Sequence, residues 1–93
     1  MLTYGKVAPL PISDEADILD SVLNTIRDVT GVRAVLPDQD FYDAGVTSVQ
    51  ALPLLLELED RFQVSIPDDR FVAARSARRL SEVLLDISKR ERA

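Results

Sequence analysis

Residues 48–62 of the chain read SVQALPLLLELEDRF, and this stretch decides the fold. Its apolar residues recur every three or four positions, the spacing typical of an amphipathic helix. Because Pro53 has no N–H to donate to the carbonyl of Val49, we expect either a kink there or a helix that starts nearer Val49 or Gln50. The predicted core stripe consists of Ala51, Leu55, Leu58 and Phe62, and roughly the opposite side carries Val49, Leu52, Pro53 and Leu56.

A second helix is predicted upstream, over about residues 14–29. Ser13 is a favourable N-cap for it, and Thr30-Gly31 supplies a stop. Residues 1–12 contain one glycine and two prolines and show no helical period. We therefore expect an extended arm over residues 1–12 and a single domain over 13–93. The apolar face of this helix consists of Ile18, Leu19, Val22, Leu23, Ile26 and Val29.

The connection between these helices, residues 31–47 (GVRAVLPDQDFYDAGVT), is long for a compact domain. A loop of this length without regular structure tends to be functional. We expect its apolar residues to pin it onto the core. These are Val32, Val35, Leu36, Phe41 and Tyr42.

The aspartates of this loop resemble a calcium-binding pattern, with Asp38, Asp40 and Asp43 at alternating or nearby positions. An EF-hand loop that began at Asp38 would need glycine at its sixth position and glutamate at its twelfth. The chain has Asp43 and Val49 at those positions. We therefore expect no metal site.

Downstream, Pro67-Asp68-Asp69 predicts a short helix over about residues 68–74, with Phe71 and Val72 facing inward. Ser76 is expected to cap a last helix. The buried stripe of that helix is Ala77, Leu80, Val83, Leu84 and Ile87. The sequence thus predicts an all-α fold, a small bundle of three main helices plus one short helix, with the long loop between the first two main helices.

Composition excludes several functions. The 93 residues include no histidine and no cysteine, so the chain cannot form a Ser-His or Cys-His pair or a zinc site with imidazole or thiolate ligands. A net charge of −5 disfavours nucleic acid as a partner. Without a long apolar run or a signal peptide, we expect no membrane span and a cytoplasmic location. An enzyme that uses carboxylates is the weakest alternative, because so short a chain leaves little room for a substrate cavity.

The charge is unevenly distributed. Residues 36–69 hold eight acidic residues and one basic residue, whereas residues 70–93 hold seven basic and three acidic ones. The acidic middle is either ordinary solvated surface or a region that steers basic partner surfaces toward it.

Residues 40–49 (DFYDAGVTSV) resemble the attachment site of the acyl carrier protein superfamily. In that family an acidic and aromatic lead-in and a glycine precede a serine at the start of the second helix. Here Gly45 lies three residues before Ser48. Ile66-Pro67-Asp68, and Ser76 with Leu80, match later family elements at the expected distances. The resemblance covers about residues 14–88.

The resemblance implies that Ser48 carries a 4'-phosphopantetheine arm, with Thr47 and Gly45 beside the attachment point. A separate phosphopantetheinyl transferase would supply the arm from coenzyme A, so the chain itself is not an enzyme. The thiol of the arm would hold an acyl or aminoacyl cargo as a thioester for loading and accepting enzymes, and the domain would be a monomer. The alternative is an unmodified helical interaction domain in which Ser48 is a plain N-cap.

The chain departs from the family pattern in its second helix. Thr47 replaces the customary aspartate, although threonine is also a good N-cap. Glu57 is the only charged side chain between Ser48 and Leu58, and Pro53 is unusual. These departures indicate a divergent carrier for a dedicated partner in a specialised pathway, either polyketide-type or for amino acids.

The exposed side of the predicted 48–62 helix suggests a docking patch. Val49 and Leu56 are seven residues apart, so they lie one above the other and point away from the core stripe. Beside the arm they would form a small apolar patch ringed by Asp43, Glu57 and Asp60. The alternative is a helix buried on all sides.

Overall fold

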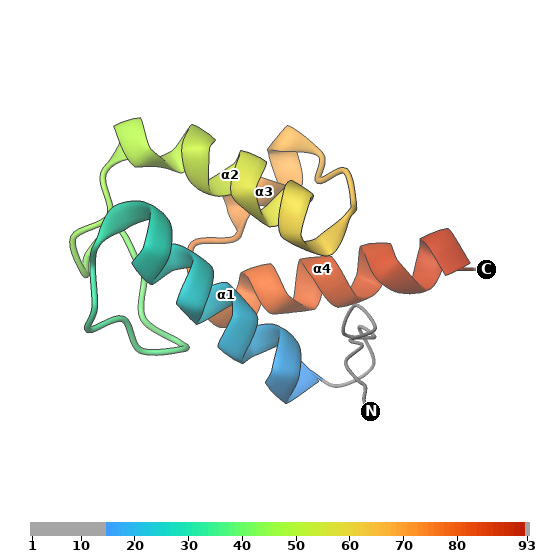
Figure 1. Cartoon of the computed structure of the whole chain (residues 1–93), viewed down its shortest axis with the longest axis horizontal. Helices are drawn as coiled ribbons and strands as arrows, with labels where there is room; N and C mark the ends of the chain where they lie inside the picture. The colour runs from blue at the N-terminus through green and yellow to red at the C-terminus, as the bar shows by residue number, and fades with distance from the viewer. Residues whose placement is uncertain (1–14, 93) are drawn as a thin grey trace, which may run out of the picture.

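The computed structural model describes residues 15–92, so the predicted arm over 1–12 and the Ser13 cap lie outside the described residues. Within that range the chain forms four α-helices: α1 (Glu15–Thr30), α2 (Ser48–Phe62), α3 (Asp68–Ala73) and α4 (Ala77–Arg92), as Figure 1 shows. The described residues contain no β-strand and form only one isolated bridge, between Asp40 and Ser76. The predicted fold, three main helices and one short helix with a long first loop, is confirmed.

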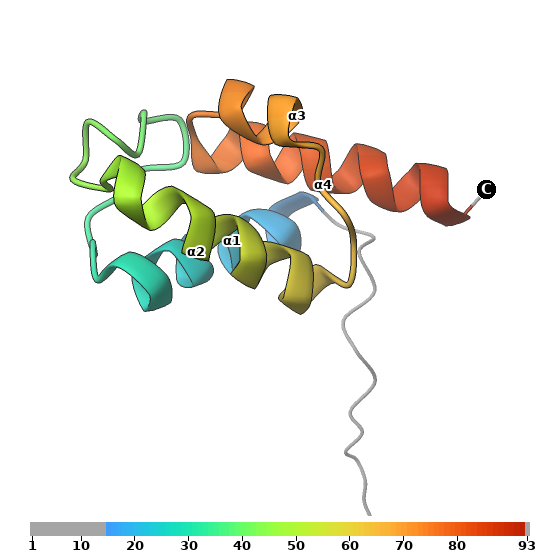
Figure 2. The same ribbon diagram turned by 90° about the horizontal axis from the view of Figure 1, so that it is seen from above.

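The helices form a small bundle around α1. This helix packs against both α2 and α4, and α3 packs against α4. The 31–47 loop and the first turn of α2 lie at one end of the described bundle, and the last turn of α4 lies at the other (Figures 1 and 2).

A single buried cluster joins all four helices and the long loop. The predicted apolar faces of α1 and α4 are confirmed, although Leu19, Leu23, Val29 and Val83 are only partly buried. The fully buried polar residues Thr25 and Ser81 were not predicted; each hydroxyl donates to a backbone carbonyl four residues earlier, which makes its burial tolerable. The buried apolar residues are Ile18, Val22, Ile26, Phe41, Val46, Leu54, Leu55, Leu58, Ile66, Phe71, Ala74, Ala77, Leu80, Leu84 and Ile87.

Two predicted core contacts are wrong. Leu36 is 66% exposed, because it lies in a turn in which Gln39 hydrogen-bonds its backbone N–H and carbonyl on the surface. Val72 is 67% exposed. Since adjacent helical residues do not share a face, Phe71 occupies the inward position of the short α3 and Val72 must point outward.

Helix α2 begins at Ser48 and runs without interruption through Pro53, so the alternative of a later start is wrong. Pro53 is exposed, which keeps its ring clear of the core. The predicted stripe omitted Leu54, which is fully buried, and it included Ala51 and Phe62, which are only partly buried. The core-facing stripe of α2 is thus centred on residues 54, 55 and 58.

Candidate attachment site

Ser48 is the first residue of α2, at the loop end of the bundle (Figure 2). The residue is exposed. Among residues 15–92, no group forms a hydrogen bond with the Ser48 hydroxyl. An approaching enzyme can therefore reach this oxygen without displacing a packed side chain.

Thr47, and not Ser48, caps the N-terminus of α2. Thr47 Oγ1 accepts a hydrogen bond from the backbone N–H of Gln50 at 3.3 Å, and Gln50 Oε1 accepts one from the backbone N–H of Thr47 at 2.9 Å. This reciprocal pair is a capping box. Gln50 Nε2 also donates to the carbonyl of Thr30 at the end of α1, at 3.3 Å. The interpretation of Ser48 as a plain N-cap is therefore wrong, and the start of α2 is held without its side chain.

A hydrogen-bonded turn leads from Asp40 into α2. The backbone N–H groups of residues 44, 45 and 46 donate to carbonyls within residues 40–42, at distances of 3.0 to 3.2 Å. Gly45 adopts a φ of +124°, which residues other than glycine rarely adopt. Phe41 and Val46 are buried, and they anchor the two ends of the turn in the core.

Two ion pairs hold this loop against the start of α4. Asp40 Oδ2 accepts from Arg75 Nε at 2.7 Å, and Asp38 Oδ1 accepts from Arg78 Nε at 2.6 Å. The hydrogen bond from Arg75 is the main cause that lowers the pKa of the Asp40 carboxyl from its ordinary value. Two aspartates of the calcium-like pattern are thus engaged with separate arginines. Within the described part of the chain, no group of three acidic side chains is gathered where it could hold a metal ion.

The predicted docking face of α2 is exposed. Val49 is 83% exposed and Leu56 is 55% exposed, and Leu52, which was not part of the predicted patch, is 60% exposed beside them. Because these side chains are exposed, the alternative of a helix buried on all sides is wrong. Their spacing of three and four residues places them on one stripe of the helix. Asp60 continues this stripe four residues after Leu56 and is exposed, as is Asp43 in the turn before α2.

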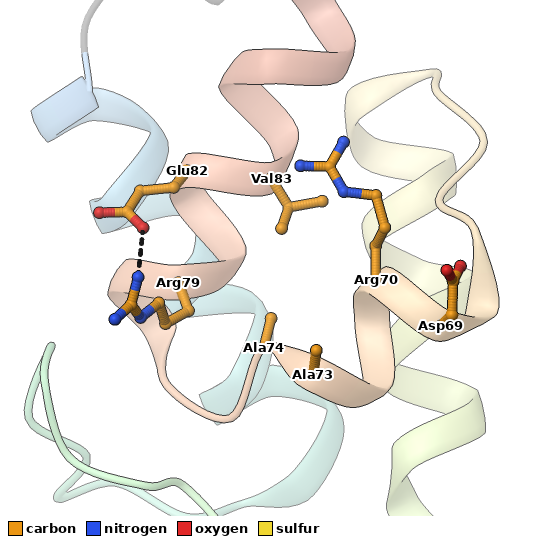
Figure 3. A pocket seen from close by; sticks show the side chains of 7 residues that line it. All are labelled: Asp69, Arg70, Ala73, Ala74, Arg79, Glu82 and Val83. Atoms are coloured by element: carbon orange, nitrogen blue, oxygen red, sulfur yellow. Dashed lines mark hydrogen bonds and ion pairs between the residues drawn. The ribbon is translucent and has the colours of Figure 1, made fainter.

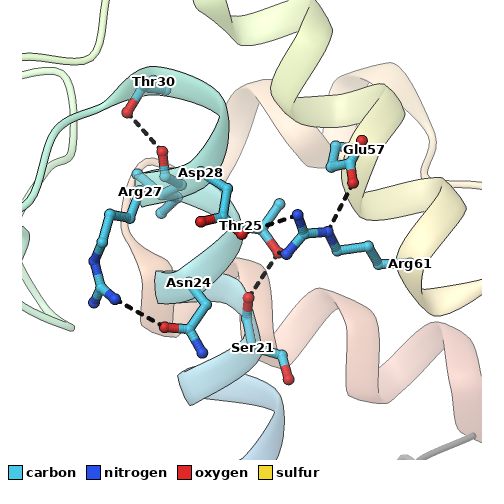
Figure 4. Close-up of polar contacts among 9 residues, drawn as sticks. Ser21, Asn24, Thr25, Arg27, Asp28, Thr30, Glu57 and Arg61 are labelled. Carbon is cyan, nitrogen blue, oxygen red and sulfur yellow. Dashed lines mark hydrogen bonds and ion pairs between the residues drawn. The ribbon is translucent and has the colours of Figure 1, made fainter.

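Glu57 is engaged within the domain, as Figure 4 shows. Arg61 donates from Nε to Glu57 Oε2 at 2.7 Å and from Nη2 to Asp28 Oδ2 of α1 at 3.0 Å. Its Nη1 donates to the buried Thr25 Oγ1 at 3.2 Å. The hydrogen bond to Glu57 is the main cause that raises the pKa of the Arg61 guanidinium. Of the three predicted acidic neighbours of the docking face, Glu57 therefore has its charge compensated by Arg61.

A family model matches most of the chain. It is described as the phosphopantetheine attachment site, and it matches residues 20–84, which include the 40–46 turn, Ser48 and all of α2. The chain belongs to the phosphopantetheine-binding family. The resemblance to the acyl carrier protein superfamily is thereby confirmed. Comparison with curated protein sequences gives no match.

The cofactor of this phosphopantetheine-binding domain is covalent 4'-phosphopantetheine, as predicted. The site fits such a group. An exposed hydroxyl stands at the first residue of a helix, where unpaired N–H groups and the helix dipole favour the negative charge of a phosphodiester. Domains of this family are in general non-catalytic carriers that interact with a phosphopantetheinyl transferase and partner enzymes.

The carrier domain also has an open hollow of about 550 Å³ between α3 and α4 (Figure 3). None of the predicted site residues lines it. Its charged rim is largely engaged, because Arg79 pairs with Glu82 and Arg70 pairs with Asp86. The hollow is lined by Asp69, Arg70, Ala73, Ala74, Arg79, Glu82 and Val83.

None of the helices described in residues 15–92 is long and apolar enough to cross a membrane.

Sequence reasoning missed three residues that hold the attachment site. Gln50 completes the capping box, and the pattern Thr-x-x-Gln at residues 47–50 is a known signature that could have identified it. Arg75 and Arg78 hold the loop before Ser48. The only signal for them is charge complementarity, since the acidic 36–69 segment precedes an arginine-rich one.

Proposed function

We propose that this domain is an acyl or aminoacyl carrier protein in which Ser48 Oγ bears the 4'-phosphopantetheine arm. The observation that carries the proposal is the exposed Ser48 hydroxyl, which has no hydrogen-bond partner in the described part of the chain and lies on a helix that Thr47 and Gln50 already cap. A serine that is neither buried nor needed for the cap is available for modification. Ser48 lies within the matched 20–84 range, three residues after Gly45, the spacing of the family motif.

The residues of the chain account for attachment and presentation, and a separate transferase accounts for catalysis. Ser48 Oγ bonds to the phosphorus of the phosphopantetheinyl group while the bond from that phosphorus to the adenosine bisphosphate part of coenzyme A breaks, and the N-terminus of α2 stabilises the charge of the resulting phosphodiester. The chain contains no histidine, the commonest general base, so an external phosphopantetheinyl transferase takes the proton from the hydroxyl. When bound, the prosthetic group supplies a thiol that carries the cargo as a thioester.

Partner enzymes dock on the apolar face of α2 formed by Val49, Leu52 and Leu56. This face begins at the residue after Ser48, so an enzyme that covers the face also reaches the arm. Arg61 compensates the charge of Glu57. Of the three predicted acidic residues around this face, Asp43 and Asp60 are exposed and form no ion pair within residues 15–92, so their charges are available to a partner. Apolar contact therefore contributes more to docking than ion pairing does, which favours a dedicated partner in a specialised pathway, polyketide-type or for amino acids.

The test is to incubate the full chain with coenzyme A and a broad-specificity phosphopantetheinyl transferase and to measure the intact mass. We expect one added phosphopantetheinyl group on the wild type and none on Ser48→Ala. Ser65→Ala, which removes another exposed serine outside the helices, serves as the matched control and should be modified normally. No mass gain with several transferases would favour the unmodified interaction domain.

The modified chain can then be offered to three kinds of loading enzyme: acyl-activating, amino-acid-activating and acyltransferase. Loading is read as a second mass increase that hydroxylamine removes, as expected for a thioester. The enzyme that charges the chain identifies the cargo class. A second mass increase that resists hydroxylamine would contradict thioester loading.

A further inference from the structure

Arg75, the residue two positions before α4, contacts three consecutive residues of the long loop. Its Nε donates to Asp40 Oδ2 at 2.7 Å, and its backbone carbonyl accepts from the N–H of Phe41 at 2.9 Å. Its guanidinium carbon lies 4.8 Å from the centroid of the Tyr42 ring, within the range of a cation–π contact. Arg75 thus holds residues 40–42 through an ion pair, a backbone hydrogen bond and a cation–π contact.

The residues that Arg75 holds are the acceptors of the turn that leads to α2. Asp40 uses its second oxygen, Oδ1, to accept from the backbone N–H of Tyr42 at 2.9 Å. The carbonyls of residues 40, 41 and 42 accept the N–H groups of residues 44, 46 and 45. Residue 46 is directly followed by the Thr47 cap. A change at Asp40 or Tyr42 is therefore transmitted along hydrogen-bonded backbone to the residue before Ser48.

The Ser48 hydroxyl has no hydrogen-bond partner among the described residues, so its position depends on the backbone on either side of it. On the helix side, Gln50 fixes that backbone to Thr30 and Thr47. On the loop side, the turn is anchored by the buried Phe41 and Val46 and by the contacts of Arg75. The Asp40 side chain is 27% exposed and that of Arg75 is 57% exposed, so water partly screens this ion pair, and the pair acts together with the buried anchors of the turn.

We propose that Arg75 is a positioning residue for modification of Ser48: by holding Asp40 and Tyr42, it keeps the 40–46 turn in the conformation that presents the serine to the transferase. The proposal rests on the proposed carrier function. If the turn loosens, only part of the population presents Ser48 correctly, and the apparent affinity for the transferase falls by that fraction. The chemical step, once the complex has formed, is unchanged.

The test compares Arg75→Gln with Arg79→Gln in the full chain. Both substitutions remove one arginine charge near the start of α4, but within residues 15–92 the Arg79 side chain pairs with Glu82 alone, at 3.4 Å, and it is 72% exposed. For Arg75→Gln we expect the KM for transfer of the phosphopantetheinyl group to rise about fivefold while kcat stays within about twofold of wild type. Arg79→Gln should match the wild type in both constants. Arg75→Lys, which keeps the charge, should recover part of the loss.

A general loss of stability would not produce this result, provided that circular dichroism shows the variant folded at the assay temperature. Equal KM values for Arg75→Gln and wild type, or an equal rise in Arg79→Gln, would overturn the proposal. If Arg75→Gln does not fold, Asp40→Asn provides the test, because the asparagine amide oxygen can still accept from the N–H of Tyr42 while the ion pair with Arg75 is removed. A KM for Asp40→Asn equal to that of wild type would likewise overturn the proposal.

Amide hydrogen exchange separates this proposal from the carrier function itself. In Arg75→Gln, the amides of residues 44, 45 and 46 should exchange faster, while those of α1 keep wild-type protection. Failure of the wild type to be modified, together with faster exchange in the turn, would contradict the carrier function and leave the hold of Arg75 on the turn established. Unchanged exchange in the turn, with normal modification of the wild type, would refute the role of Arg75 alone.

Discussion

Arg61 of α2 donates a hydrogen bond to the buried hydroxyl of Thr25 in α1, at 3.2 Å. Thr25 Oγ1 in turn donates to the carbonyl of Ser21 at 2.7 Å. The same guanidinium binds Asp28 and Glu57, so one side chain joins the two helices through three acceptors (Figure 4). The α1–α2 interface therefore contains a polar connection beside its apolar core.

Thr25→Val should lower the free energy of unfolding by about 1 kcal/mol, because it keeps the shape of the side chain but removes the acceptor for Arg61. Urea denaturation measures the change. Asn24→Ala is the control on the same helix. Among the described residues the exposed Asn24 side chain pairs with the exposed Arg27 alone, so the effect of this substitution should stay within about 0.5 kcal/mol. Equal losses in the two variants would contradict a specific role for the Arg61 contact.

Leu56→Asp should leave the helical circular dichroism spectrum intact and weaken loading by the cognate enzyme. Leu56 is 55% exposed, so a charge there costs the fold little but disrupts an apolar docking surface. An effect of about tenfold on the apparent affinity is expected for a central contact.

Val72→Asp is the matched control for this prediction. Val72 is 67% exposed on α3, so the substitution makes the same chemical change at a similar exposure but away from α2. It should load normally. A large loss of helicity in Leu56→Asp would place that residue in the core and end the docking hypothesis. Equal loading defects in Leu56→Asp and Val72→Asp would show that the loading defect is not specific to α2.

Thr47→Ala should lower the free energy of unfolding by about 1 kcal/mol, since it removes the acceptor for Gln50 at the start of α2. Thr47→Asp keeps a cap and adds a negative charge where the helix dipole favours it, so its stability should equal or exceed that of the wild type. Thermal denaturation compares the three proteins. A Thr47→Asp protein as unstable as Thr47→Ala would show that the cap depends on more than an acceptor oxygen.

The domain should lose stability on acidification through Asp40 and Asp86. The pKa of each carboxyl is held below its ordinary value of 3.8, mainly by hydrogen bonds from Arg75 and Arg70 respectively. Because the folded-state pKa is the lower one, the stabilisation is present above about pH 3.8 and is lost as the pH falls below that value toward the folded-state pKa.

Urea midpoints measured from pH 7 down to pH 3 test this expectation. The double variant Asp40→Asn/Asp86→Asn should show a shallower decline at the acidic end than the wild type does. Superimposable pH profiles would mean that these two ion pairs do not contribute to the acid sensitivity of the fold.

The helices could be predicted closely from the sequence, because periodic apolar residues and caps are local signals. The 48–62 helix has the bounds that its pattern indicates, and the 14–29 prediction ends one residue before α1 does, while residue 14 lies outside the described residues. The predicted burial of Leu36 and Val72 is wrong because the hydrophobicity of a residue alone does not determine whether it is buried. Whether such a residue is buried depends on the direction of the chain in a turn or a one-turn helix, which the local pattern does not specify.

The sequence predicts Ser48 as the attachment residue, but it does not predict the contacts that hold the turn before it. The position of Ser48 follows from motif spacing, and its exposure agrees with the predicted role. Arg75 and Arg78 lie 35 and 40 residues from the aspartates they bind. Contacts across such separations are set by how α4 packs against the loop, and one sequence contains no direct signal for that packing.

Since the capping box closes on Thr47 and Gln50, the cap of α2 does not use the Ser48 side chain. A phosphodiester on its hydroxyl should therefore leave the cap intact, and the negative charge at this helix N-terminus should raise the unfolding temperature slightly. Because this cap is the same with and without a group on Ser48, we expect an enzyme that distinguishes a loaded arm from an empty one to contact the end of the arm and not the start of α2.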